Sequence, residues 1–181
     1  GRYVCACTMP ITDGMVVLND TGRLNEMRRA IVEMLFVEGN HICSFCEESG
    51  ECELQAMARR LKMDAPRFPF QYPKQDVDMS HPDVWIDRNR CIKCGRCIRA
   101  SRDIDGKSIF AFVDRGPDMR LAVAARGRLS ETQIAAADRA VEACPVGALM
   151  IKREGYHTPY GRRTYDRKRI GADIEDTAQA P

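Results

Sequence analysis

The residues of this 181-residue sequence with the most distinctive chemistry are its nine cysteines. An odd number excludes complete pairing into disulfides within the chain. We find no secretory signal peptide and no apolar run of membrane-spanning length, so we expect a cytoplasmic protein without a membrane span. Clustered cysteines in such a protein bind metals more often than they form disulfides. The groups are Cys5 and Cys7; Cys43, Cys46 and Cys52; and Cys91, Cys94 and Cys97, with Cys144 apart.

The third group has the spacing C-x2-C-x2-C, which carries three thiolates to different irons of a cubane cluster. Bacterial ferredoxins continue this run as C-x3-C-P, but here Ser101 takes the place of the fourth cysteine. A cysteine followed by proline occurs at Cys144, 47 residues after Cys97. We therefore predict one [4Fe-4S] cluster held by Cys91, Cys94, Cys97 and Cys144. Structural zinc is the weaker alternative, because zinc ligands usually come as two close pairs.

The second group lies near a histidine, and together they give the spacing H-x1-C-x2-C-x5-C from His41 to Cys52. Three cysteines and one imidazole also suit tetrahedral zinc, so spacing alone leaves the metal open. The stretch "HICSFCEESGECELQ" resembles the His/Cys-ligated [4Fe-4S] segment of the large subunit of respiratory complex I, iron-only hydrogenases and NAD-linked hydrogenases. This resemblance implies a second [4Fe-4S] cluster, with His41, Cys43, Cys46 and Cys52 as its ligands.

His41 departs from the complex I pattern, which has three residues between the histidine and the first cysteine. Only Ile42 separates His41 from Cys43 here. The three cysteines are therefore firmer ligands than His41. The alternative is a loop histidine beside an iron that is open or bound to water.

The N-terminal stretch "CACTMPITDGMVV" resembles the end of a plant-type [2Fe-2S] domain, and Cys7 matches the fourth ligand of that cluster. The other three ligands would lie upstream of Gly1. We expect the sequence to be truncated there, so a [2Fe-2S] cluster is predicted only if the missing segment is present. Cys5 has no counterpart among the ligands and is expected to be a buried thiol.

The C-terminal stretch "KREGYHTPYGRRTYD" resembles the tail of the diaphorase small (gamma) subunit of NAD-reducing nickel–iron hydrogenases. The order of sites over residues 5–149 resembles the N-terminal part of the complex I subunit. These resemblances imply an electron relay between a flavin-bearing NAD(H) subunit and the small and large hydrogenase subunits.

The same residues are compatible with other functions. One alternative is the equivalent subunit of a complex-I-like NADH dehydrogenase or an NAD-linked formate dehydrogenase. Another is a zinc-binding scaffold or nucleic-acid module, although a formal net charge of +2 does not favour a polyanion. The sequence holds no dinucleotide fingerprint, no P-loop and no nucleophile–base pair. We therefore expect an oxidoreductase subunit with no substrate-binding active site of its own, and no nucleic acid among its partners.

The elements expected before residue 80 surround the first cluster segment. We predict a short strand from Tyr3, a turn at residues 12–14 and a strand over residues 15–18. Apolar residues at helical spacing predict a helix from about residue 20 to Gly39, with its methionines in the core. A second helix is expected over residues 51–62, followed by an extended linker rich in proline and aromatic residues.

The second half reads as a ferredoxin-like module of alternating strands and helices. We predict strands at "DVWIDRNR", "SIFAFVDRG" and "ALMIKRE", a short helix after Cys97, and a core position for Trp85. Ser130 and Gln133 form a capping-box pattern for a helix over residues 131–143.

The fold class is therefore α+β, a helical His/Cys segment followed by a ferredoxin-like [4Fe-4S] module. The expected domains are a [2Fe-2S] remnant (1–19), a His/Cys3 helical domain (20–64), a linker (65–80), the ferredoxin-like domain (81–154) and a basic irregular tail (155–181), which we expect to dock onto a partner subunit.

Charges along the sequence suggest different reduction potentials for the two clusters. Acidic residues lie near the first group of ligands and basic residues near the second, and positive charge favours the reduced state. We therefore predict the higher potential for the second cluster. The acids are Glu47, Glu48, Glu51 and Glu53; the bases are Arg88, Arg90, Lys93, Arg96, Arg99 and Arg102.

Overall fold

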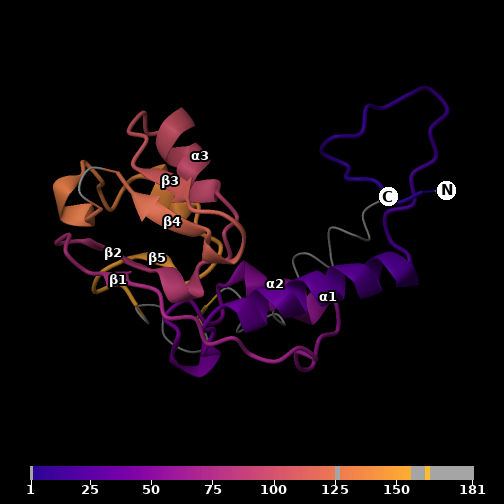
Figure 1. The fold of residues 1–181 in the computed structure, drawn as a ribbon, viewed down its shortest axis with the longest axis horizontal. Coiled ribbons are helices and arrows are strands. Elements are labelled where there is room, and N and C mark those ends of the chain that lie inside the picture. Colours follow the sequence, from indigo (N-terminus) through magenta and orange to yellow (C-terminus); the bar gives the residue numbers. More distant parts are fainter. Residues whose placement is uncertain (1, 125–126, 156–161, 164–181) are drawn as a thin grey trace.

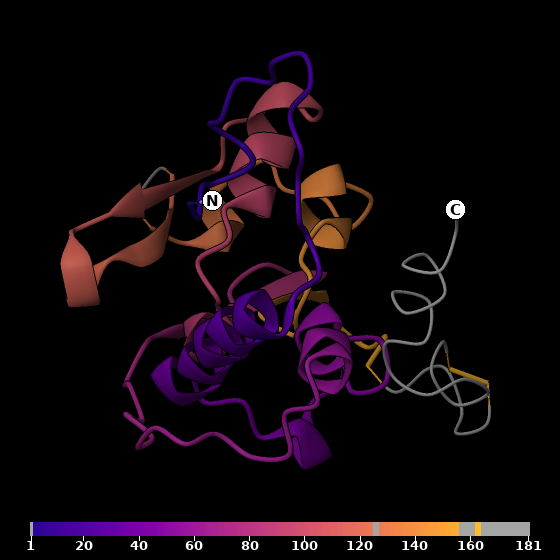
Figure 2. The same cartoon turned by 90° about the vertical axis from the view of Figure 1, so that its right-hand side faces the viewer.

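The computed structural model describes residues 2–124, 127–155 and 162–163 (Figure 1). A pair of helices lies beside a module built from short strands and helices, and the two views show the pair separate from strands β3 and β4 (Figures 1 and 2). The elements are α1 (Gly22–Glu38), α2 (Glu53–Arg60), β1 (Val77–Asp78), β2 (Val84–Asp87), α3 (Arg96–Asp103), β3 (Phe110–Val113), β4 (Arg120–Val123), α4 (Arg139–Glu142) and β5 (Leu149–Ile151).

The helix expected near residue 20 is α1, and its ends follow from local chemistry. Thr21 is the N-cap, and its hydroxyl oxygen accepts a hydrogen bond from the backbone N–H of Leu24. The helix ends before Gly39, as expected. The expected core position of its methionines is wrong, because Met27 and Met34 are exposed. Val32 and Val37 supply the buried side instead.

The N-terminal segment contains neither of the two expected strands. Residues 2–20 have no strand pairing, although the turn is present as a bond from the Met15 N–H to the carbonyl oxygen of Thr12 at 3.2 Å. The segment projects past the N-terminal end of α1 (Figure 1). A strand needs a partner for its backbone groups, and an isolated hairpin is marginal in water. Cys5 is exposed, so its expected burial is also wrong.

The ferredoxin-like module has two small antiparallel sheets. One has the order β1-β2-β5, with Ile86 opposite Leu149, and the other pairs β3 with β4. The strands expected at β2, β3 and β5 are confirmed, whereas β1 and β4 were not expected. Trp85 is only partly buried. The module's own core includes Val84, Ile86 and Leu129.

The helix expected over residues 131–143 is wrong, because only Arg139–Glu142 is α-helical. The chain before it is tied to the linker, since the N–H of Leu129 donates to Asp78 at 2.7 Å and that of Ser130 to Ser80 at 3.1 Å. A 3₁₀ turn over Leu129–Glu131 replaces the first helical turn. Tertiary hydrogen bonds therefore override the capping box of Ser130.

Candidate cluster-binding sites

The first predicted ligand set lines a single pocket between α1, α2 and the β5 side of the module. The pocket is lined by His41, Cys43, Cys46 and Cys52, and by Phe36, Ile42, Ser49, Leu54, Gln55, Arg90, Val146 and Gly147. A 3₁₀ turn over Cys43–Phe45 and the start of α2 after Cys52 place the three sulfurs around it. The short H-x1-C spacing therefore does not keep the imidazole away from the thiols.

His41 has two properties expected of a metal ligand: a buried nitrogen that is not hydrogen-bonded to the described residues, and a neutral imidazole. Its Nε2 is buried and makes no hydrogen bond with the described residues. Burial first, and then the positive charge of Arg90, lower the pKa of His41 to about 4, so the imidazole is neutral at pH 7. A neutral imidazole is the form that ligates metals. A buried polar atom with no partner is costly, and a metal ligand role would satisfy it.

Gly39 provides the space for this imidazole. A Cβ at position 39 would lie 2.6 Å from Nε2 of His41 and 2.9 Å from the carbonyl oxygen of Asn89. The φ angle of Gly39 is −112°, so no backbone strain calls for glycine here. Glycine is required by close packing, a reason beyond the helix-stop role that the sequence suggested.

The second predicted ligand set lines another pocket. Cys91, Cys94, Cys97 and Cys144 all face it, with Ile86, Ile92, Gly95, Phe112, Leu121, Pro145, Val146, Ala148 and Leu149. Gly95 is the N-cap residue of α3 and has a φ of 69°, a conformation that favours glycine. The chain therefore turns between Cys94 and Cys97 and brings both thiols to one pocket with the distant Cys144.

Burial raises the pKa values of the ligand thiols. It raises the pKa of Cys52 and of Cys97 to about 12 and that of Cys144 to about 11. The pKa values of Cys46 and Cys91 are also raised, again mainly by burial. Free thiols would therefore be protonated at pH 7, and iron must displace their protons to bind.

The donor sets of both pockets fit iron–sulfur clusters, which are held by thiolates and sometimes by histidine. Among the residues that the structure describes, no group of three or more His, Cys, Asp or Glu is arranged to hold a single metal ion.

The two pockets share a wall. Val146 lines both of them. The backbone N–H of Glu53, the residue after Cys52, donates to the carbonyl oxygen of Pro145, the residue after Cys144, at 2.9 Å. A cluster of buried side chains joins α1 and α2 to the same segment of the module, including Val32, Leu54, Leu61, Val146 and Ala148.

Two arginine–glutamate pairs also cross between the sites, and sequence reasoning missed both. Each arginine directly precedes a ligand of the second set, and each glutamate directly follows a ligand of the first. Arg96 binds Glu53 through two bonds of 2.6 and 2.7 Å, and these side chains are 43% and 49% exposed. Arg90 binds Glu47 at 2.7 Å, and these side chains are only 19% and 27% exposed.

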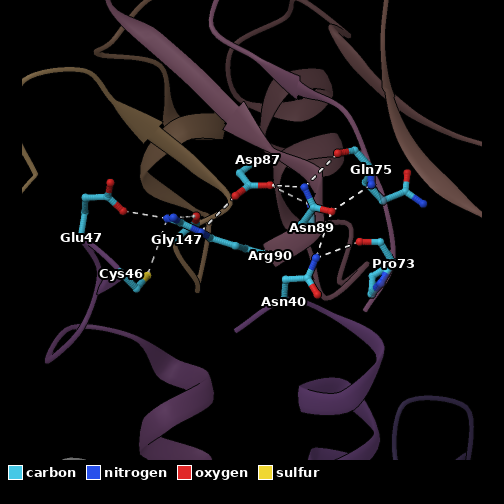
Figure 3. A network of polar contacts seen from close by, with 9 residues as sticks. All are labelled: Asn40, Cys46, Glu47, Pro73, Gln75, Asp87, Asn89, Arg90 and Gly147. Atoms are coloured by element: carbon cyan, nitrogen blue, oxygen red, sulfur yellow. Dashed lines mark hydrogen bonds and ion pairs between the residues drawn. The ribbon is translucent and has the colours of Figure 1, made fainter. Parts of the chain in front are cut away.

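Arg90 extends to the first site, and Figure 3 shows its side chain between Glu47, Cys46 and Asp87. Its Nη1 lies 3.9 Å from Sγ of Cys46 and 3.3 Å from the carbonyl oxygen of Gly147. Its Nε lies 3.1 Å from Oδ2 of Asp87, and its guanidinium sits 5.5 Å from the ring centre of Trp85. In sequence Arg90 adjoins Cys91, so no spacing signal assigned it to the other site. The acidic and basic groups of the two sites are therefore not separated in space.

Two family models match parts of the chain that include the two pockets' predicted ligands. Residues 28–67 match a family described as the NADH-ubiquinone oxidoreductase-G iron-sulfur binding region. Residues 84–151 match a family described as a 4Fe-4S single cluster domain. Each match contains all four predicted ligands of one pocket, and Cys144 lies near the end of the second match.

The chain is similar to the gamma subunit of the NAD-reducing hydrogenase HoxS from Cupriavidus necator, with 39% identity over 95% of this chain and 74% of the relative. The chain belongs to this gamma-subunit family. A crystal structure of an NAD+-reducing [NiFe]-hydrogenase in the H2-reduced state contains a chain with 46% identity and a TM-score of 0.85, over 90% of this chain and 70% of that one. The fold is thus a mixed α and β arrangement with a 4Fe-4S ferredoxin-like domain.

The relationship to complex I is also confirmed. The mitochondrial 78 kDa subunit of NADH-ubiquinone oxidoreductase from Candida albicans is 33% identical over 83% of this chain, but only 21% of that relative is covered. As a gamma-subunit family member, the protein is an iron–sulfur electron-relay subunit of an oxidoreductase complex. No helix in the described part of the chain is long and apolar enough to cross a membrane.

Two further predictions concern Cys7 and the basic tail. Cys7 is exposed, and its role as a [2Fe-2S] ligand stays a prediction. The basic tail lies mostly outside the described residues. Of its residues, Arg163 is buried, and its Nη1 donates to the carbonyl oxygen of Ser49 at 3.2 Å.

Proposed function

We propose that this gamma subunit holds two [4Fe-4S] clusters and passes single electrons between them. His41, Cys43, Cys46 and Cys52 would hold the first, and Cys91, Cys94, Cys97 and Cys144 the second. The observation that carries this proposal is that each ligand set lines one pocket and that Val146 lines both. The clusters supply one-electron chemistry when bound.

The surrounding residues bind the ligands in place and limit the access of water. Phe36 and Leu54 supply apolar surface in the first pocket, and Ile86 and Phe112 do so in the second. A dry, apolar shell lowers the local dielectric constant and shifts the potential of a buried cluster. The shared wall at Val146 keeps both sites within one packed region.

The partners follow from the family. A flavin- and NAD(H)-binding diaphorase subunit would exchange electrons with this chain on one side. The small and large subunits of a nickel–iron hydrogenase would do so on the other. The two hydrogenase relatives support an NAD-reducing hydrogenase, which we place in the cytoplasm. Cys7 would complete a [2Fe-2S] cluster if an upstream segment supplies the other ligands.

A second assignment is an equivalent relay subunit in a complex-I-like NADH dehydrogenase or an NAD-linked formate dehydrogenase. The match of residues 28–67 to the complex I family favours keeping this alternative. Affinity purification from the native cell would decide between the two, because a nickel–iron subunit would accompany only the hydrogenase form.

The test of the cluster proposal is the iron and acid-labile sulfide content of the chain purified without oxygen. We expect about eight irons and eight sulfides per chain, the content of two cubanes. Cys43→Ser and Cys94→Ser should each remove about half, from different sites. Zinc without sulfide would contradict the proposal.

A further inference from the structure

We propose that Arg90 sets the reduction potential of the first cluster by donating an N–H to the sulfur of Cys46. Arg90 would be a positioning and tuning residue, not a ligand. This inference rests on the proposed function, because it requires a cluster on His41, Cys43, Cys46 and Cys52. It concerns a residue that the chain supplies from the second site's segment.

The guanidinium is fixed by its surroundings. Glu47 and Asp87 bind it from two sides, Gly147 accepts a further bond, and the Trp85 ring lies beneath it. Its side chain is 19% exposed. Because Asp87 holds Nε and Glu47 and Gly147 hold Nη1, the guanidinium stays beside Cys46 without a cluster and needs little rearrangement when one binds.

Physical chemistry gives the direction of the effect. Hydrogen bonds to cluster sulfurs and nearby positive charge both stabilise the reduced, more negative state and raise the potential. Glu47 and Asp87 offset part of the charge, but they do not remove the N–H donor. A bound cluster would accept one electron from the NAD(H)-linked partner or from the hydrogenase and pass it on, while Arg90 would keep its proton throughout.

Arg90 therefore acts against the charge pattern of the sequence. That pattern predicts the higher potential for the second cluster, and Arg90 is one of the six basic residues near the second cluster's ligands in the sequence. Arg90 instead raises the reduction potential of the first cluster and so narrows the difference in potential between the two clusters. A small difference in reduction potential allows electron transfer in either direction between the two clusters.

The matched control is Arg96. It also precedes a ligand of the second set and binds a glutamate after a ligand of the first. Among the described residues, however, no hydrogen bond joins it to a cysteine sulfur. Arg96→Gln thus removes the same charge, at the same sequence relationship, without removing a donor to a cluster ligand.

The experiment is a potentiometric EPR measurement of both clusters in the complete complex, for the wild type, Arg90→Gln, Arg90→Lys and Arg96→Gln. We expect Arg90→Gln to make the first cluster's potential more negative and to shift the second cluster's potential less. Arg90→Lys should shift it less, because the charge stays and the fork is lost. Arg96→Gln should shift the first cluster less than Arg90→Gln.

Iron content separates the possible failures. A wild type without two clusters would overturn the proposed function. Two clusters with potentials unchanged in both Arg90 variants, or shifted equally by Arg96→Gln, would overturn the role of Arg90. If Arg90→Gln loses the first cluster, Arg90→Lys alone decides, since a retained cluster with an unshifted potential then overturns the inference.

Discussion

The backbone N–H of Glu53 donates to the carbonyl oxygen of Pro145 at 2.9 Å, so the residues that follow two ligands of different clusters are hydrogen-bonded to each other. Glu53 is also the first residue of α2. The bond joins the helical segment to the ferredoxin-like module at the wall between the pockets. It offers a direct way to test how strongly the two sites depend on each other.

Glu53→Pro should lower the thermal midpoint of cluster loss relative to Glu53→Gln. Both variants lose the ion pair with Arg96, but only proline lacks the N–H. Proline is tolerated at the first helical position, and Cys52 has a ψ of 121°, which suits a residue before proline. We expect Glu53→Pro to be less stable than Glu53→Gln by about 1 kcal/mol, the net contribution of one hydrogen bond to stability. Loss of visible absorbance on heating without oxygen gives the midpoint, and equal midpoints would contradict the expectation.

Gly39→Ala should disturb the first cluster and spare the second. Its Cβ would come 2.6 Å from Nε2 of His41, while the carbonyl oxygen of Asn89 blocks the other side. The imidazole must then move, which should change the EPR signal of the first cluster or reduce its iron. Gly22→Ala is the control, because a Cβ there meets nothing within 4 Å. An unchanged first-cluster signal in Gly39→Ala would show that His41 is not a ligand.

Arg67→Met should destabilise the helical segment. Glu33 is 1% exposed, and Nε of Arg67 binds both of its carboxylate oxygens, at 3.0 and 2.8 Å. Removing the arginine leaves a buried carboxylate without this partner, at a cost of about 1–3 kcal/mol. Thermal unfolding followed by circular dichroism measures the loss. The double variant Glu33→Leu with Arg67→Met should recover part of it, and a double variant less stable than the single one would contradict this explanation.

Asp105→Ala should loosen Cys144. The carboxylate of Asp105, just after α3, accepts the backbone N–H groups of Arg139 and Ala140 at 3.0 Å each and so caps α4, which leads into Cys144. Loss of a cap costs about 1 kcal/mol. The second cluster should then lose iron faster to a chelator, while the first is affected less. Asp105→Asn, which retains one acceptor oxygen, should lie between the alanine variant and the wild type.

Local signals predicted the elements that depend on local chemistry. Thr21 and Gly39 bound α1 as expected, because caps and apolar periodicity are encoded within a few residues. The capping box at Ser130 failed because Asp78 and Ser80, distant in sequence, take the N–H groups of Leu129 and Ser130. No residue near Ser130 in the sequence indicates that distant side chains compete with the expected helix for these N–H groups.

The candidate sites also combine features that the local sequence predicts with one that depends on the fold. Cysteine spacing and the resemblance predicted two groups of four ligands, and each group lines one pocket. A short loop confines the ligands within it, whereas Cys144 reaches its pocket only through the fold. The position of Arg90 was not predictable, because its contact with Cys46 joins residues 44 apart and its neighbour Cys91 belongs to the other site. Only the fold shows which cluster a flanking charge faces.

The pocket of the first site has a consequence for the timing of its assembly. Its predicted ligands all lie before residue 53, yet Val146 and Gly147 form part of its lining. A ribosome must therefore synthesise the ferredoxin-like module to its last strand before this pocket can close. A cluster inserted while the chain is still emerging would face solvent on one side, so stable loading of the first site follows synthesis of the second.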